Sequence, residues 1–182
     1  MTIENQNSQR GNFTACAGLV TEQDLALVTG TLEKIREDGG DPLQFMLNLQ
    51  MQAQQHLSNT LTYVPRPDKL ETCGEILDWM KQQDDSIADE TRELYTALGG
   101  MSNGEKPASA VFKPWKADHL MRRATKFSDL SESDRLEVAF ELIDQWHFFM
   151  CKFLALGMDS ETIFKLYALK QAENIRRWSN NY

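Results

Sequence analysis

The sequence predicts an all-α fold on three observations. Only 10 glycines and 5 prolines occur in 182 residues, so residues that break helices are scarce. Leucine occurs 21 times against 12 valines and isoleucines combined, a balance that favours helices over sheets. Residues that cap or end helices punctuate the chain at intervals typical of helical segments. We therefore expect a bundle of amphipathic helices packed through their apolar faces.

The expected helices follow from these punctuating residues. Thr21 with Asp24 can cap a first helix that ends at Gly39-Gly40, and Asp41-Pro42 supplies a cap and a first-turn proline for the second. The prolines of residues 62–69 end that second helix. Further helices are expected to begin near residues 68, 86, 115, 131 and 160, and the last four of them to end near residues 99, 126, 157 and 178. Asp159 or Ser160 is expected to cap the last helix. Residues 101–114 are expected to form a loop.

We expect a single domain over residues 20–182, preceded by a loose arm over residues 1–19. Two apolar stripes at helical spacing are interpreted as its core packing. They consist of Phe140, Ile143, His147, Cys151 and Leu154, and of Ile87, Leu94 and Leu98.

Composition excludes several classes of function. The net charge of −8 disfavours nucleic-acid binding, which needs clustered positive charge. The most apolar segment, Trp146 to Met158, is interrupted by His147 and Lys152 and is too short to cross a membrane. The three cysteines are widely spaced, so neither a disulfide framework nor a Cys-x-x-Cys metal site is expected. With a polar N-terminus, these features indicate a cytoplasmic protein.

Two pairs of acidic residues are candidate metal ligands. Glu90 with Glu93, and Glu141 with Asp144, each stand three residues apart on an expected helix, so each pair shares one helix face. The second pair lies in the most apolar helix, where unpaired carboxylates would be costly. Oxygen ligands from two facing helices suit Mg²⁺, with Mn²⁺ as a possible substitute.

Two other interpretations of these acids stay open. Acid pairs at this spacing are also common on exposed helices, where they bind nothing. A di-iron carboxylate site would want a Glu-x-x-His motif on each of two helices. Asp144-x-x-His147 resembles half of one, but the Glu90 helix has no histidine to match it, and His147 is better interpreted as a packing residue.

The last expected helix carries a complementary signal. Lys170, Asn174 and Arg177 step by four and then three residues, which places two cations and an amide on one face. Such a face can bind phosphate groups, because arginine offers a planar fork of donors and lysine a point charge. Cations near the C-terminus of any solvated helix look the same, because they complement the helix dipole.

Together these residues resemble a known family. The stretches DPLQFMLNLQ, RPDKLET, IADETREL, GEKPASAVFKPWKA, LEVAFELIDQWHF and ALGMDSETIFKLYALKQAENIRR are similar to the dCTP pyrophosphatases (dCTPase-dUTPases) of the T-even bacteriophages. More broadly, the chain is identified as a member of the all-α NTP pyrophosphatase superfamily, which includes the dimeric dUTPases and the MazG proteins. The similarity covers roughly residues 41–182.

The resemblance implies roles for individual residues. It makes Glu90, Glu93, Glu141 and Asp144 the Mg²⁺ ligands, and it makes Glu90, with Glu93, the group that orients or deprotonates the attacking water. It implies that substrate is bound by seven further residues. These are Gln50 at the base, Trp115 and Lys116 beside the nucleotide, and Lys170, Asn174, Arg177 and Tyr182 at the phosphates.

Some positions depart from the family pattern. Gln171 stands where asparagine is usual, Trp178 replaces a glutamine and Asn181 a glycine. Ala53 occupies the position of a base-contacting asparagine in the dimeric dUTPases. None of these differences affects the four acidic residues. They bear on base specificity and on the C-terminal segment.

The resemblance implies an enzyme that hydrolyses dCTP, and dUTP, to the monophosphate and pyrophosphate with Mg²⁺. It further implies a homodimer that removes dCTP from the pool during phage DNA synthesis in the host cytoplasm, in association with nucleotide-synthesis enzymes. Two alternatives stay open. One is a strict dUTPase or a MazG-like enzyme with another base preference, and the other is a helical interaction module without activity.

Overall fold

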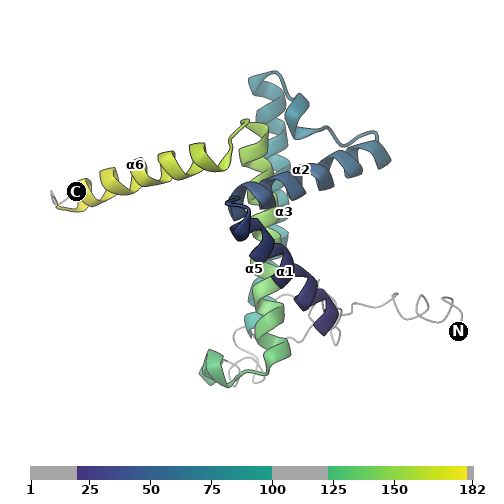
Figure 1. Ribbon diagram of the computed structural model, residues 1–182. Helices are drawn as coiled ribbons and strands as arrows, with labels where there is room; N and C mark the ends of the chain where they lie inside the picture. The colour runs from purple at the N-terminus through teal and green to yellow at the C-terminus, as the bar shows by residue number, and fades with distance from the viewer. Residues whose placement is uncertain (1–19, 100–122, 180–182) are drawn as a thin grey trace, which may run out of the picture. The chain divides into compact units, whose positions relative to one another are not determined.

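The computed structural model describes residues 20–99 and 123–179, and every regular element in them is helical (Figure 1). This confirms the predicted all-α fold class. The order of elements is α1 (Glu22–Glu37), α2 (Pro42–Thr60), η3 (Pro67–Lys69), α3 (Cys73–Gly99), η4 (Phe127–Asp129), α5 (Glu132–Ala155) and α6 (Ser160–Ser179). Residues 1–19, with the predicted arm, lie outside the described residues, as do Trp115, Lys116 and Tyr182. Of the helix expected over residues 115–126, residues 123–126 are described: Arg123 and Ala124 are helical, whereas Thr125 and Lys126 are not.

Most helix ends form as the capping residues predict. Asp41 accepts a hydrogen bond from the backbone N–H of Leu43 at 2.8 Å and so caps α2. Asp159 accepts one from the N–H of Thr162 at 2.8 Å and caps α6. Between α5 and α6, Gly157 has a φ of 64°, a left-handed conformation that glycine adopts without strain.

The predicted helices beginning near residues 68 and 86 are wrong, because one continuous helix, α3, replaces them. Its N-terminus is a capping box: Thr72 Oγ1 accepts from the N–H of Glu75, and a carboxylate oxygen of Glu75 accepts from the N–H of Thr72 at 2.8 Å. No glycine or proline occurs between residues 75 and 98. Ser86 therefore continues the helix, although its side chain could also have capped a new one.

The chain divides into two compact units, with boundaries after Val28, between Gln83 and Asp84, and between Phe148 and Phe149. The first unit contains the later part of α3 and the earlier part of α5, and the second unit contains the rest of both helices with α2 and α6. Within each unit α3 and α5 run side by side in opposite directions (Figure 1).

The second unit has a small apolar core. Trp79 and Cys151 are 3 % and 0 % exposed, Ala155 is buried beside them, and Val64 and Leu70 pack against this group. The indole Nε1–H of Trp79 donates to the carbonyl oxygen of Cys151 at 3.3 Å. This hydrogen bond and the apolar contacts hold α3 against α5 at this level.

The predicted apolar stripe on α5 is only partly a core. Cys151 is fully buried, but Ile143 and His147 are exposed. In the first unit the most deeply buried residues of α5 are acids, Glu137 and Glu141. Only one face of a helix points inward at a given level. Because the inward face of α5 carries these carboxylates here, Ile143 and His147 face solvent.

Candidate metal site and neighbouring residues

Three of the four predicted metal ligands converge within the first unit. Glu90 and Glu93 project from α3 and Glu141 from α5, and carboxylate oxygens of all three lie within 4.8 Å of one another. The i, i+3 spacing places the first two on one helix face, and the packing of α3 beside α5 brings the third to meet them. The fourth acid, Asp144, is one turn further along α5, and its Oδ1 lies 3.4 Å from His147 Nδ1.

The burial of Glu141 distinguishes this group from a solvated acidic surface. Glu141 is 6 % exposed, and its Oε2 is buried without a hydrogen-bond partner among the described residues. A buried carboxylate oxygen without a partner is costly unless a cation compensates it. The donor set consists of oxygen atoms alone, which is the chemistry that Mg²⁺ and Mn²⁺ prefer. The residues present therefore fit a divalent cation.

The electrostatics of the cluster agree with this fit. Burial, together with the charges of Glu93, Glu137, Glu90 and Asp144, raises the pKa of Glu141 to about 8. Burial, with the charges of Glu93 and Asp144, raises the pKa of Glu90 to about 7. Without a cation the cluster thus retains protons at neutral pH, and a bound cation would replace them.

A polar contact fixes the two acid-bearing helices beside the cluster. The hydroxyl group of Thr91, next to Glu90, lies 3.2 Å from the side-chain oxygen of Gln145, next to Asp144. The amide nitrogen of Gln145 also donates to the carbonyl oxygen of Glu141 at 3.3 Å. Thr91 and Gln145 were not among the predicted site residues, since neither is charged and neither is one of the paired acids.

Glu137 is a further acid that sequence reasoning missed. It lies one turn before Glu141 on α5, is 6 % exposed, and contributes to the raised pKa of Glu141. Its spacing of four residues from Glu141 was a usable signal, because it places both on one face. The electrostatic field at the cluster therefore comes from five acids rather than four.

The phosphate-binding residues predicted on α6 belong to the second unit and are partly engaged. Arg177 Nε donates to Glu173 at 2.8 Å, and Arg176 makes two bonds of 2.8 Å to the two oxygens of the same carboxylate. These bonds, with smaller contributions from the charges of Arg177 and Lys170, lower the pKa of Glu173 to about 2. Lys170 is exposed and Asn174 half-buried. The predicted cationic face of α6 thus also carries an acid, Glu173, which was not among the predicted residues.

Gln50, the predicted base-binding residue, is also in the second unit. It is half-buried on α2, and its amide Nε2 donates to Cys151 Sγ at 3.2 Å. The sequence identified Gln50 by resemblance alone and gave no indication of this thiol contact.

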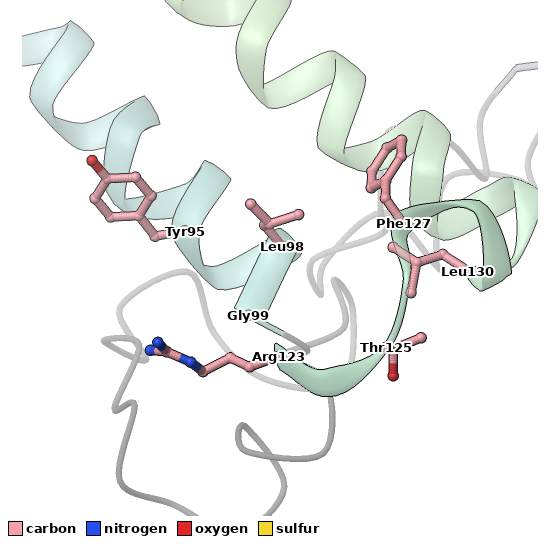
Figure 2. A pocket seen from close by; sticks show the side chains of 7 residues that line it. All are labelled: Tyr95, Leu98, Gly99, Arg123, Thr125, Phe127 and Leu130. Carbon is pink, nitrogen blue, oxygen red and sulfur yellow. The ribbon is translucent and has the colours of Figure 1, made fainter.

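A cavity of about 520 Å³ lies at the C-terminal end of α3 in the first unit (Figure 2). Tyr95 and Leu98 line it from α3, and Phe127 and Leu130 line it from η4 and the residue after it. Arg123, Thr125 and Gly99 complete the described lining. The lining is mostly apolar, and none of the four predicted metal ligands is among these residues.

Comparison with known proteins decides the family. The chain is 55 % identical over 172 residues to the dCTP pyrophosphatase of Enterobacteria phage LZ5, a match that covers 94 % of this chain and 99 % of that protein. It is 46 % identical over 171 residues to the dCTP pyrophosphatase of Enterobacteria phage T4, with the same coverage of both chains. This chain belongs to the dCTP pyrophosphatase family of T4-type phages.

Membership in the dCTP pyrophosphatase family confirms two expectations, the resemblance itself and the class of enzyme, a nucleoside triphosphate pyrophosphatase.

A DNA replication protein of phage T4 is also 46 % identical, over 159 residues that make up 87 % of this chain and 40 % of that protein. No family model and no solved structure matches the chain. Among the residues of this chain that the structure describes, no helix is long and apolar enough to span a membrane.

Proposed function

We propose that this protein hydrolyses dCTP, and also dUTP, to the nucleoside monophosphate and pyrophosphate in a reaction that requires Mg²⁺. The observation that carries the proposal is the converging acid cluster with the buried, unpartnered Oε2 of Glu141, in a member of the dCTP pyrophosphatase family. A buried group of carboxylates is unfavourable by itself, so its presence is explained by a cation that compensates it.

Glu90, Glu93, Glu141 and Asp144 would hold Mg²⁺, for which Mn²⁺ can substitute. Bound there, the cation would supply charge neutralisation for the triphosphate and a lowered pKa for water. Glu90 would orient the attacking water and accept its proton. A carboxylate whose pKa is raised toward neutrality by burial suits that task, because a general base works best near the pH of the reaction.

The substrate would be held by residues outside the acid cluster. Lys170 and Arg177 supply positive charge and hydrogen-bond donors for phosphate oxygens, and Asn174 an amide. Gln50 would read the base through its amide group. Trp115, Lys116 and Tyr182, which lie outside the described residues, remain the resemblance-based candidates for further nucleotide contacts.

We further propose that the active form is a homodimer. Large apolar side chains on α6 support this, since Phe164 is 71 % exposed, Tyr167 70 % and Leu169 68 %. Exposed apolar surface of this kind is typical of an association surface. Light scattering on the purified protein tests this proposal, and a monomer at micromolar concentration would contradict it.

The biological role we propose is removal of dCTP from the deoxynucleotide pool during phage DNA synthesis, in the host cytoplasm and in association with nucleotide-synthesis enzymes. Co-purification of the tagged protein from infected cells, followed by identification of its partners, tests the association. Recovery without any such enzyme would contradict it.

The test of the activity is pyrophosphate release from dCTP, dUTP, dTTP, dATP, dGTP and CTP, each with Mg²⁺ and again with excess EDTA. We expect release from dCTP and dUTP alone, and loss of release with EDTA. Release from dUTP alone would favour a strict dUTPase, and release from several of the other nucleotides as well a MazG-like enzyme. No release from any nucleotide would overturn the proposal.

A further inference from the structure

The second unit holds α2, which carries Gln50, at two points. The side-chain oxygen of Gln44 accepts a hydrogen bond from the N–H of Ser160, at the start of α6, at 3.0 Å. Six residues later Gln50 Nε2 lies 3.2 Å from Cys151 Sγ on α5. The backbone that carries Gln50 is therefore fixed, and the orientation of its side-chain amide depends on its own neighbours.

The neighbour that orients the amide is the thiol of Cys151. This residue is 0 % exposed, and its carbonyl oxygen is bonded to the indole of Trp79, which holds its backbone in place. Burial raises the pKa of the thiol, which therefore stays uncharged at neutral pH. In the observed contact the sulfur acts as acceptor and Nε2 as donor.

A glutamine amide can be turned so that either end meets a given partner, and the two orientations present opposite chemistry. Here the nitrogen end of the amide, Nε2, faces the sulfur. The carbonyl oxygen Oε1 is then the end of the amide directed away from Cys151. The thiol hydrogen can also donate, and the orientation observed here is the one in which the sulfur accepts. Without the thiol, rotation about the last side-chain bond would exchange the two ends at little cost.

We propose that Cys151 is a positioning residue for base selection: it fixes the amide of Gln50 so that Oε1 meets the exocyclic group of the pyrimidine. This inference rests on the proposed function, in which Gln50 reads the base. An outward acceptor pairs with the 4-amino group of cytosine, which donates, and is repelled by the 4-oxo group of uracil, which accepts. The Gln50 and Cys151 pair would thus favour dCTP over dUTP.

The test compares kcat/KM for dCTP and dUTP in the wild-type protein and in Cys151→Ala, Cys151→Ser and Cys73→Ser. Cys73, an exposed thiol at the start of α3, is the matched control. We expect the dCTP to dUTP ratio to fall about ten-fold in Cys151→Ala, mainly through a higher KM for dCTP. Cys151→Ser keeps an acceptor and should stay within about two-fold of wild type, as should Cys73→Ser.

A structural role alone would not reproduce this pattern. In a Gln50→Met background, which lacks the amide, Cys151→Ala should leave the ratio unchanged. If Cys151→Ala does not fold, as judged by circular dichroism and thermal unfolding, Cys151→Val fills the thiol volume without an acceptor and serves in its place. An unchanged ratio in the folded variant, or the same change in the Gln50→Met background, would overturn the inference while the proposed function stands. A wild-type protein that hydrolyses neither nucleotide would refute the proposed function, and this inference with it.

Discussion

The hydroxyl oxygen of Thr91 lies 3.2 Å from the side-chain oxygen of Gln145, and this contact joins the two acid-bearing helices one residue from Glu90 and one from Asp144. The same hydroxyl lies 2.7 Å from the carbonyl oxygen of Ile87, so its one proton lies between an acceptor on α3 and an acceptor on α5. The separation of the carboxylates across α3 and α5 therefore depends on an uncharged contact as well as on the acids.

Thr91→Val keeps the shape of the side chain and removes its hydroxyl. We expect the Mg²⁺ concentration for half-maximal activity to rise about ten-fold, because groups that orient metal ligands act on that scale. Titration of activity with Mg²⁺ checks this. The matched control is Thr60→Val, an exposed threonine on α2 whose hydroxyl donates to the carbonyl oxygen of His56 in its own helix. Equal effects of the two substitutions would contradict a role specific to the cluster.

Glu141→Gln removes the charge of the most buried acid and keeps its size. We expect turnover of dCTP to fall at least about 100-fold, because a positioned charge at a reacting centre is lost. Helix content should be unchanged. Stopped assays of pyrophosphate, with circular dichroism alongside, measure both quantities. Glu132→Gln, an exposed acid in the first turn of the same helix, is the control and should stay near wild type.

The stability of the metal-free protein should fall as the pH rises. The folded-state pKa values of about 7 for Glu90 and about 8 for Glu141 are above the ordinary value of 4.5. The stability from their bound protons is fully present below pH 4.5 and is lost as the pH rises through 7 and 8. Added Mg²⁺ should therefore raise the melting temperature more at pH 8.5 than at pH 5.5.

Thermal unfolding with EDTA and with Mg²⁺ across this pH range provides the measurement. The difference between the two curves should be smaller in Glu141→Gln, which has one acid fewer to titrate. A Mg²⁺ effect that is the same at both pH values would show that the cluster does not bind the ion.

If Arg177 binds phosphate groups as proposed, Glu173 competes with them for this arginine. Glu173→Gln removes the negative charge between the two arginines, so KM for dCTP should fall roughly two- to five-fold, on the scale of an exposed ion pair. The effect should decrease with added salt, which screens exposed charges. Glu161→Gln is the control, since it removes an acid of the same helix that pairs with Lys165. A higher KM in Glu173→Gln would indicate that the acid orients the arginines for binding instead.

Trp79→Phe tests the core of the second unit. It removes the hydrogen bond from the indole to the carbonyl oxygen of Cys151 and leaves a small void among buried residues. We expect the free energy of unfolding to fall by about 1–3 kcal/mol. Urea denaturation measures this change. Trp178→Phe, on an exposed tryptophan of α6, should cost less than about 0.5 kcal/mol, and similar losses for the two would contradict the assigned core.

The sequence by itself determined the class of fold and most helix ends, because those depend on local chemistry. The caps at Asp41 and Asp159 satisfy backbone groups within two or three residues, so spacing along the chain was enough. The order of motifs also determined the family. The main error in the helices, two predicted helices where α3 runs without a break, arose at Ser86, because serine can cap a helix and is also tolerated in its interior.

Only the tertiary structure decided which face of each helix is buried. Helical spacing placed Glu141 and Asp144 on one face but could not say whether that face or the apolar stripe with Ile143 turns inward, because burial depends on the neighbouring helix. The same reason hides the contacts between residues far apart in the chain, Gln50 with Cys151 and Thr91 with Gln145. Such contacts form only when separate helices pack, and no local sequence pattern predicts them.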